Sequence, residues 1–251
     1  MDFVDYEGHQ VAYTYEGKGT PVLLVHGFCE DSSVWDEFQV DLLEEGYRVI
    51  RVDLPGFGKS EVIPDISIEG MAKAVQAVLD ALNNGPVVYI GHSMGGYVGL
   101  ALTRLFPESL MGLGLFHSHP YEDSGEKKAN RLKSVEFIER QGHVLFVKQL
   151  LPSLFNENFA NSNAFLLEKI TYRAAKFDTQ GIIAAQRAMA ARGSEEETLK
   201  NTDLPVLFII GKEDQVVPQD RSMAQTHLPK LASIHILDRV AHMGMFEDRK
   251  K

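Results

Sequence analysis

Short apolar runs of strand length recur along the chain, rich in valine and isoleucine and without clean polar alternation. Strands buried on both faces, as in parallel sheets covered by helices, have this pattern. The opening stretch differs, because apolar and polar residues alternate on both sides of Glu7 and Gly8, which predicts an antiparallel hairpin. The runs expected to form buried strands span residues 22–25, 47–52, 87–90, 113–116, 206–210 and 234–237.

Helical patterns fall between these runs. In residues 68–82, Met71, Val75 and Val78 share one apolar stripe, which predicts an amphipathic helix. Residues 94–106 form a second helical pattern, and Pro107 lies just beyond its end. Alternation of strands and helices is typical of a doubly wound α/β sheet.

The alternation stops between residues 120 and 200, where the helical period continues without a convincing strand. A segment of about eighty residues is far too long for a loop. We therefore expect a helical cap over the carboxyl edge of the sheet, with core residues 1–119 before it and 201–251 after it. The alternative is that these helices belong to the main core.

Composition narrows the class of protein. The chain has 251 residues, 44% of them hydrophobic, and a formal charge of 25 − 35 = −10. An acidic surface repels nucleic acid and anionic membranes, so we expect neither as a partner. Cys29 is the single cysteine, no apolar run reaches the ~20 residues of a membrane helix, and the first residues lack a signal-peptide pattern. These features favour a cytoplasmic protein, which we expect to be a monomer or a homodimer.

Residues 91–95 form a G-x-S-x-G sequence centred on Ser93, directly between an apolar strand and a helix. A sharp strand-to-helix turn strains the serine and brings backbone segments together, so Gly91 and Gly95 carry no side chain. This context predicts a nucleophile. The alternatives are a serine that only caps a helix and a glycine-rich turn that binds phosphate.

A serine nucleophile needs a base, and the base needs an acid to orient it. Asp214 follows the strand at 206–210, and His242 follows the strand at 234–237, which places both where open α/β sheets bind ligands. We therefore predict a triad of Ser93, Asp214 and His242. The competing acids are Glu213, Asp238, Glu122 and Asp123.

Acyl transfer also needs N–H groups that stabilise an oxyanion. The backbone N–H groups of Met94, which follows the nucleophile, and Phe28, in the loop after residues 22–25, are the predicted donors. Phe28 is alternatively a core aromatic. His117 and His119 could hold a metal, but no acidic or cysteine ligand follows at suitable spacing, so we predict loop histidines at a pocket mouth. The residues proposed for the pocket wall, each with a plain core role as the alternative, are Trp35, His117, Tyr121 and Phe146.

Together these segments resemble the α/β-hydrolase superfamily, in particular its lid-bearing serine esterase, lactonase and haloperoxidase-like members. The resemblance implies a mostly parallel, eight-stranded sheet with a helical cap after the sixth strand. The family continues into a final helix after its histidine, whereas nine residues follow His242 here (251 − 242). The matching motifs are His26-Gly27-Phe28, the D-x-P-G-x-G-x-S segment 53–60, the elbow 91–95, the acid loop 211–218 and Ala241-His242.

The predicted function is hydrolysis of a small carboxylic ester, thioester or lactone through an acyl-enzyme on Ser93. The partner would be a small-molecule acyl substrate, and we expect neither a metal nor an organic cofactor. Two alternatives remain at this stage: a C–C bond hydrolase or lyase that uses the same triad, and a ligand-sensing protein with slow turnover.

Overall fold

The computed structural model describes residues 1–249, and within them the strands form one eight-stranded sheet in the order β1-β2-β4-β3-β5-β6-β7-β8. β2 pairs antiparallel with β1 and β4, and every other neighbouring pair is parallel. The predicted mostly parallel α/β architecture is confirmed. The strands are β1 (Asp2–Tyr6), β2 (His9–Gly17), β3 (Pro21–Val25), β4 (Arg48–Val52), β5 (Val87–His92), β6 (Leu110–Phe116), β7 (Val206–Gly211) and β8 (Ala232–Leu237).

Burial of the strands follows their place in the sheet. β3 lies between β4 and β5, and all its residues are buried, as its unbroken apolar sequence predicts. β8 was expected to be equally buried, but only Leu237 is, because this strand is the sheet edge and pairs with β7 alone. The apolar run at residues 234–237 therefore predicted the strand correctly, but the prediction that the strand is buried was wrong.

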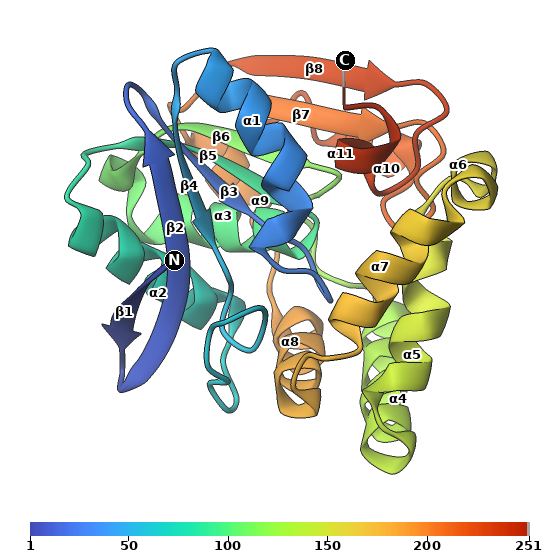
Figure 1. The fold of residues 1–251 in the computed structure, drawn as a ribbon. Coiled ribbons are helices and arrows are strands. Elements are labelled where there is room, and N and C mark those ends of the chain that lie inside the picture. Colours follow the sequence, from blue (N-terminus) through green and yellow to red (C-terminus); the bar gives the residue numbers. More distant parts are fainter. Residues whose placement is uncertain (250–251) are drawn as a thin grey trace.

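Helices flank the sheet on both faces (Figure 1). The helix predicted at residues 68–82 is α2, where Ser67 Oγ accepts the Gly70 N–H at 3.0 Å and caps the first turn. The longer helices outside the insertion are α1 (Asp36–Glu44), α2 (Ile68–Leu82) and α3 (Met94–Leu105); the shorter elements are η1 (Ser32–Trp35), η2 (Pro107–Ser109), α10 (Gln219–Ala224) and α11 (Gly244–Glu247).

Between β6 and β7 the described chain is helical throughout its regular elements. Figure 1 shows α4 to α8 gathered beyond one end of the sheet, where α4 packs against α5 and α8. The division into core and cap stays a prediction. These elements are α4 (Gly125–Gln141), α5 (His143–Leu150), η3 (Leu151–Leu154), α6 (Glu157–Ser162), α7 (Ala164–Ala174), α8 (Thr179–Ala191) and α9 (Glu196–Asn201).

A buried ion cluster joins the two ends of this helical segment. The Asp123 carboxylate, in the segment between β6 and α4, contacts Arg131 Nε of α4 at 2.5 Å and Arg192 Nη2, just after α8, at 2.9 Å. The Arg192 guanidinium also lies 3.9 Å from the centre of the Tyr97 ring in α3. Burial acts to raise the Asp123 pKa, but the two arginines prevail and lower it to about 2. The cluster therefore fastens the helices to the sheet layer.

Among residues 1–249, no helix combines the length and the apolar character that crossing a membrane requires.

Candidate active site

The turn between β5 and α3 is strained at Ser93. Its φ of 49° and ψ of −112° lie outside the regions that a non-glycine residue ordinarily occupies. Such a conformation costs about 1–3 kcal/mol and persists only where the surroundings hold it. Here the Ser93 N–H donates to the Phe116 carbonyl of β6 at 2.9 Å, and Ser118 Oγ donates to the Ser93 carbonyl at 2.7 Å. The serine is thus held at a partly exposed position at the carboxyl end of the central strands.

Gly95 lets α3 approach the end of β3. A side-chain Cβ at this position would lie 2.6 Å from the Val25 oxygen and 2.7 Å from the His26 oxygen. Because both neighbours are backbone atoms, Gly95→Ala is expected to lower the free energy of unfolding by about 1–3 kcal/mol. Chemical denaturation would measure the change. Gly125→Ala is the matched control, since a Cβ there meets nothing within 4 Å, and equal losses in both variants would contradict this explanation.

His242 and Asp214 are hydrogen-bonded to one another. His242 Nδ1 donates to Asp214 Oδ2 at 2.8 Å, while Asp214 Oδ1 accepts the N–H groups of Val216 (2.8 Å) and Val217 (2.9 Å). Burial acts to raise the Asp214 pKa, but His242 and His117 outweigh it and hold this pKa well below its usual range. The carboxylate is therefore charged across the physiological range and fixes the proton of His242 on Nδ1.

The competing acids have other partners. Asp238 is exposed and pairs with Lys212 at 2.5 Å, and Glu122 pairs with Lys128 at 2.6 Å. Glu213 accepts a hydrogen bond from the Asn156 amide, and Asp123 belongs to the arginine cluster. Of the acids weighed from the sequence, Asp214 is the one that the structure places on His242.

Backbone contacts from several segments hold the loop of His242. Its N–H donates to the Leu154 carbonyl of η3 at 2.9 Å, and its carbonyl accepts His92 Nε2 at 2.8 Å. The neighbouring Ala241 N–H donates to Glu247 at 2.6 Å, and burial raises the Glu247 pKa to about 7. The His92 and His242 rings lie 4.9 Å apart, so the histidine loop is anchored directly beside the elbow.

A second buried pair, which the sequence analysis did not identify, links this loop to the one after β3. Glu30 Oε2 accepts the Gly27 N–H at 2.7 Å and pairs with His92 Nδ1 at 3.0 Å. Burial works against charge on His92, but Glu30 prevails and raises the His92 pKa. Glu30 and His92 therefore connect the loop of Gly27, the elbow and His242. An acidic residue three positions after Gly27, in a segment otherwise expected to be buried, was the available clue.

The predicted oxyanion donors are available. Among the described residues, no acceptor takes the backbone N–H of Phe28 or Met94. His26 shapes the loop of Phe28, because its Nε2 accepts the Leu54 N–H at 2.9 Å and its Nδ1 donates to the Gly27 carbonyl at 2.7 Å. The Phe28 ring packs edge-on against Phe146 of α5 with centroids 6.2 Å apart, so the inserted helices reach this loop.

Of the other residues proposed for the pocket wall, Trp35 and His117 are buried, whereas Tyr121 is partly exposed. Trp35 is fully buried against Phe38 and Phe116, so the core alternative describes it. His117 and His119 are each 1% exposed, which differs from the expected position at a pocket mouth. His117 contacts Asp214, whereas His119 contacts the Tyr97 hydroxyl at 3.3 Å and stacks on the partly exposed Tyr121.

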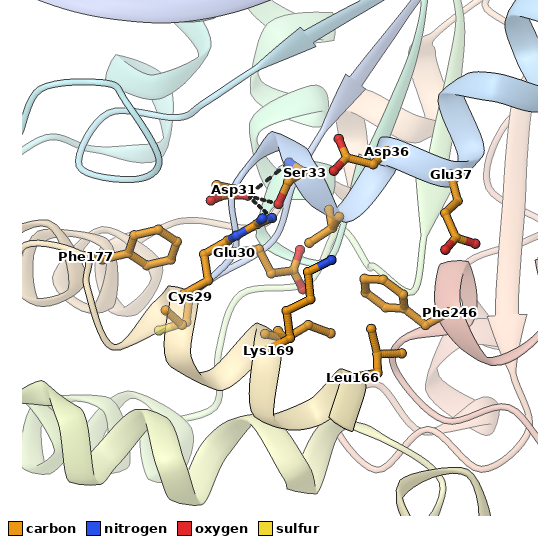
Figure 2. A pocket seen from close by; sticks show the side chains of 14 residues that line it. Cys29, Glu30, Asp31, Ser33, Asp36, Glu37, Leu166, Lys169, Phe177 and Phe246 are labelled. Atoms are coloured by element: carbon orange, nitrogen blue, oxygen red, sulfur yellow. Dashed lines mark hydrogen bonds and ion pairs between the residues drawn. The ribbon is translucent and has the colours of Figure 1, made fainter. Parts of the chain in front are cut away.

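A small cleft lies between the loop after β3 and α7 (Figure 2). Cys29 and Glu30, which follow Phe28, form part of its wall. Asp31 and Arg173 span it with an ion pair of 3.6 Å, and Figure 2 shows Lys169 extending from α7 toward the acidic residues of the opposite side. The cleft therefore borders the oxyanion loop at the seam between the core and the inserted helices, although Ser93 is not among its lining residues.

His117, Asp214 and His242 are also close enough to share a metal ion, with one ligand atom from each within 4.8 Å of the others. Both Nδ1 atoms face the same carboxylate oxygen, as N–H donors do. Hydrogen bonding therefore accounts for the cluster without an ion.

Comparisons with known proteins agree with this fold. The family model described as "alpha/beta hydrolase fold" matches residues 20–115. A solved esterase from Thermogutta terrifontis is 30% identical, covers 99% of this chain and 93% of its own, and superposes with a TM-score of 0.93. The chain belongs to the α/β-hydrolase family. It is accordingly a hydrolase enzyme.

Other relatives of this hydrolase are named for different substrates. It is 28% identical to the 2-hydroxy-6-oxo-6-(2'-aminophenyl)hexa-2,4-dienoic acid hydrolase of Metapseudomonas resinovorans, over 98% of this chain and 85% of that protein. It is also 28% identical to the 3-oxoadipate enol-lactonase 1 of Acinetobacter baylyi, over 88% of this chain and 81% of that protein. The relatives thus include an esterase, a dienoic acid hydrolase and an enol-lactonase.

Proposed function

We propose that this protein hydrolyses a small carboxylic ester, thioester or lactone through an acyl-enzyme on Ser93. The observation that carries the proposal is the buried hydrogen bond from His242 Nδ1 to Asp214, beside a serine held in a strained strand-to-helix turn. In the neutral ring this bond holds the proton on Nδ1 and leaves Nε2 as the atom that accepts a proton. The esterase and the enol-lactonase among the relatives agree with this chemistry.

The proposed reaction has two halves. His242 Nε2 removes the Ser93 hydroxyl proton while Oγ bonds to the carbonyl carbon, and the N–H groups of Phe28 and Met94 stabilise the oxyanion. The bond to the leaving group then breaks, and His242 gives the proton to that group. In the second half His242 takes a proton from water, the hydroxide attacks the acyl carbon, and Ser93 leaves with the proton returned.

The test is Ser93→Ala together with active-site labelling. A fluorophosphonate probe should label Ser93, and Ser93→Ala should abolish hydrolysis of p-nitrophenyl acetate because the proposed acyl-enzyme then has no nucleophile. Ser134→Ala is the control, since that hydroxyl donates to the Asn130 carbonyl within α4 in a solvent-exposed hydrogen bond. Full activity in Ser93→Ala, or a label on another residue, would contradict the proposal.

A second candidate is hydrolysis of a C–C bond by the same residues, which is favoured by the similarity to the dienoic acid hydrolase. A panel of simple esters, lactones, β-diketones and vinylogous acids, assayed at equal concentrations, would separate the two. A higher kcat/KM for the β-diketones or vinylogous acids than for every ester and lactone would favour C–C bond hydrolysis over ester hydrolysis.

A further inference from the structure

Two histidines contact the Asp214 carboxylate. Its Oδ2 atom faces His242 Nδ1 at 2.8 Å and His117 Nδ1 at 3.2 Å. Its other oxygen accepts the N–H groups of Val216 and Val217, so four N–H groups surround one carboxylate. A triad needs only the bond to His242, and the second histidine is therefore an addition that orientation of the base does not require.

The surroundings of His117 settle which of its nitrogens carries the proton. Nδ1 faces a carboxylate, whereas Nε2 is buried without a partner among the described residues. A proton on Nε2 would leave a buried donor unsatisfied and turn the Nδ1 lone pair toward the negative charge. Burial also lowers the His117 pKa to about 4, so the ring is neutral and Nδ1–H donates to Asp214.

The backbone supports a dedicated position for this ring. His117 follows β6 with a φ of 51°, in the left-handed region that ordinary side chains avoid. Its N–H donates to the Ile209 carbonyl of β7 at 2.9 Å, which fixes the residue beside the strand that leads to Asp214. The ring packs so closely against α11 that a Cβ on Gly244 would lie 2.5 Å from its Nε2.

We propose that His117 is a positioning residue of the catalytic machinery. Its Nδ1–H donates to Asp214, which holds the carboxylate in place and stabilises its negative charge, so that His242 stays available as a neutral base. This inference rests on the proposed role of Asp214 and His242. A carboxylate that accepts three other hydrogen bonds stabilises the protonated form of His242 less strongly than a carboxylate that accepts only the two backbone bonds. Without the His117 donor, protons would bind His242 more tightly.

The charged and titratable groups that surround these side chains are His92 with its partner Glu30, and Glu247 and Glu213 near the histidine loop.

The experiment compares His117→Leu with His117→Asn, which have nearly the same shape. The amide nitrogen of asparagine occupies a place equivalent to Nδ1, so this variant keeps a donor for Asp214. Asparagine also tolerates the positive φ of this position. Leucine keeps the volume without the donor. His117→Gly also removes the donor and relieves the backbone strain, which covers the case in which the leucine variant does not fold.

Two readouts are needed. The first is the acid limb of the pH profile of kcat/KM, and the second is NMR titration of the His242 ring, which does not depend on turnover. Both should move up by about 0.5–1 pH unit in the leucine and glycine variants, because one lost hydrogen bond of ordinary strength changes proton affinity about three- to tenfold. His117→Asn should stay within about 0.2 pH unit of the parent protein on the same scale.

Unchanged titration in His117→Gly, or an equal shift in His117→Asn, would overturn the inference. Lower activity with an unmoved profile would assign His117 a purely structural role and would equally overturn it. Failure of the proposed function is seen separately, as activity that survives Ser93→Ala.

Discussion

Asp214→Asn is expected to lower kcat for ester hydrolysis by about 10⁴-fold. An amide that turns its NH₂ group toward His242 Nδ1 favours the tautomer with the proton on Nε2, which cannot accept the Ser93 proton. The oxygen of the new amide can still accept the N–H groups of Val216 and Val217, so the loop after β7 keeps its backbone contacts. Activity assays across pH, with circular dichroism to verify folding, would measure the effect.

Asp238→Asn is the matched control for this prediction. Asp238 is also near His242 in the sequence and was a competing acid, but its carboxylate is exposed and pairs with Lys212. Its replacement should leave kcat unchanged. If Asp238→Asn costs as much activity as Asp214→Asn, or if Asp214→Asn keeps more than about a tenth of the parent kcat, the assignment of the orienting acid is wrong.

Asp123→Asn is expected to destabilise the protein by about 3–5 kcal/mol, because removal of one partner leaves a buried charge uncompensated. The Asp123 carboxylate is fully buried and the Arg192 side chain is only 5% exposed, so water cannot replace the lost partner. Chemical denaturation at pH 7 would measure the change. Glu122→Gln is the control, since its exposed carboxylate pairs with Lys128 at the surface, and it should leave the denaturation midpoint in place.

The same cluster predicts a pH dependence. The Asp123 pKa is about 2 in the folded protein and 3.8 in its reference state, so folding favours the charged form. The stability that this provides is complete above about pH 4 and is lost as the pH falls toward 2. The stability difference between the parent protein and Asp123→Asn should therefore shrink in acid over that interval. A difference that stays constant from about pH 6 to about pH 2.5 would contradict this account.

Local sequence was sufficient for several features of this hydrolase. The apolar runs, the amphipathic stripe of α2 and the strand-turn-helix at Ser93 depend on neighbouring residues, whose hydrophobic period and backbone sterics act over short distances. The chain order also carried information. Strands that run parallel bring their carboxyl ends to one edge, so the loops that hold Ser93, Asp214 and His242 were expected to meet there.

Partners far apart in the chain could not be assigned in this way. His117 lies 97 residues from Asp214, and Glu30 lies 62 residues from His92. Their contacts depend on which strands are neighbours and on how deeply each loop is buried. The hydrophobic period of a segment gives no information about either. For the same reason Trp35 was predicted for a pocket wall although it packs in the core.

By itself, then, the sequence determined the α/β class, the helical segment between β6 and β7 and the candidate residues of a serine hydrolase. The tertiary structure decided which acid meets His242, that His117 shares the same carboxylate, and that Glu30 and His92 connect three loops. The physical reason is that motifs report local backbone geometry, whereas hydrogen bonds between buried side chains depend on packing, and packing is established only when distant segments come together.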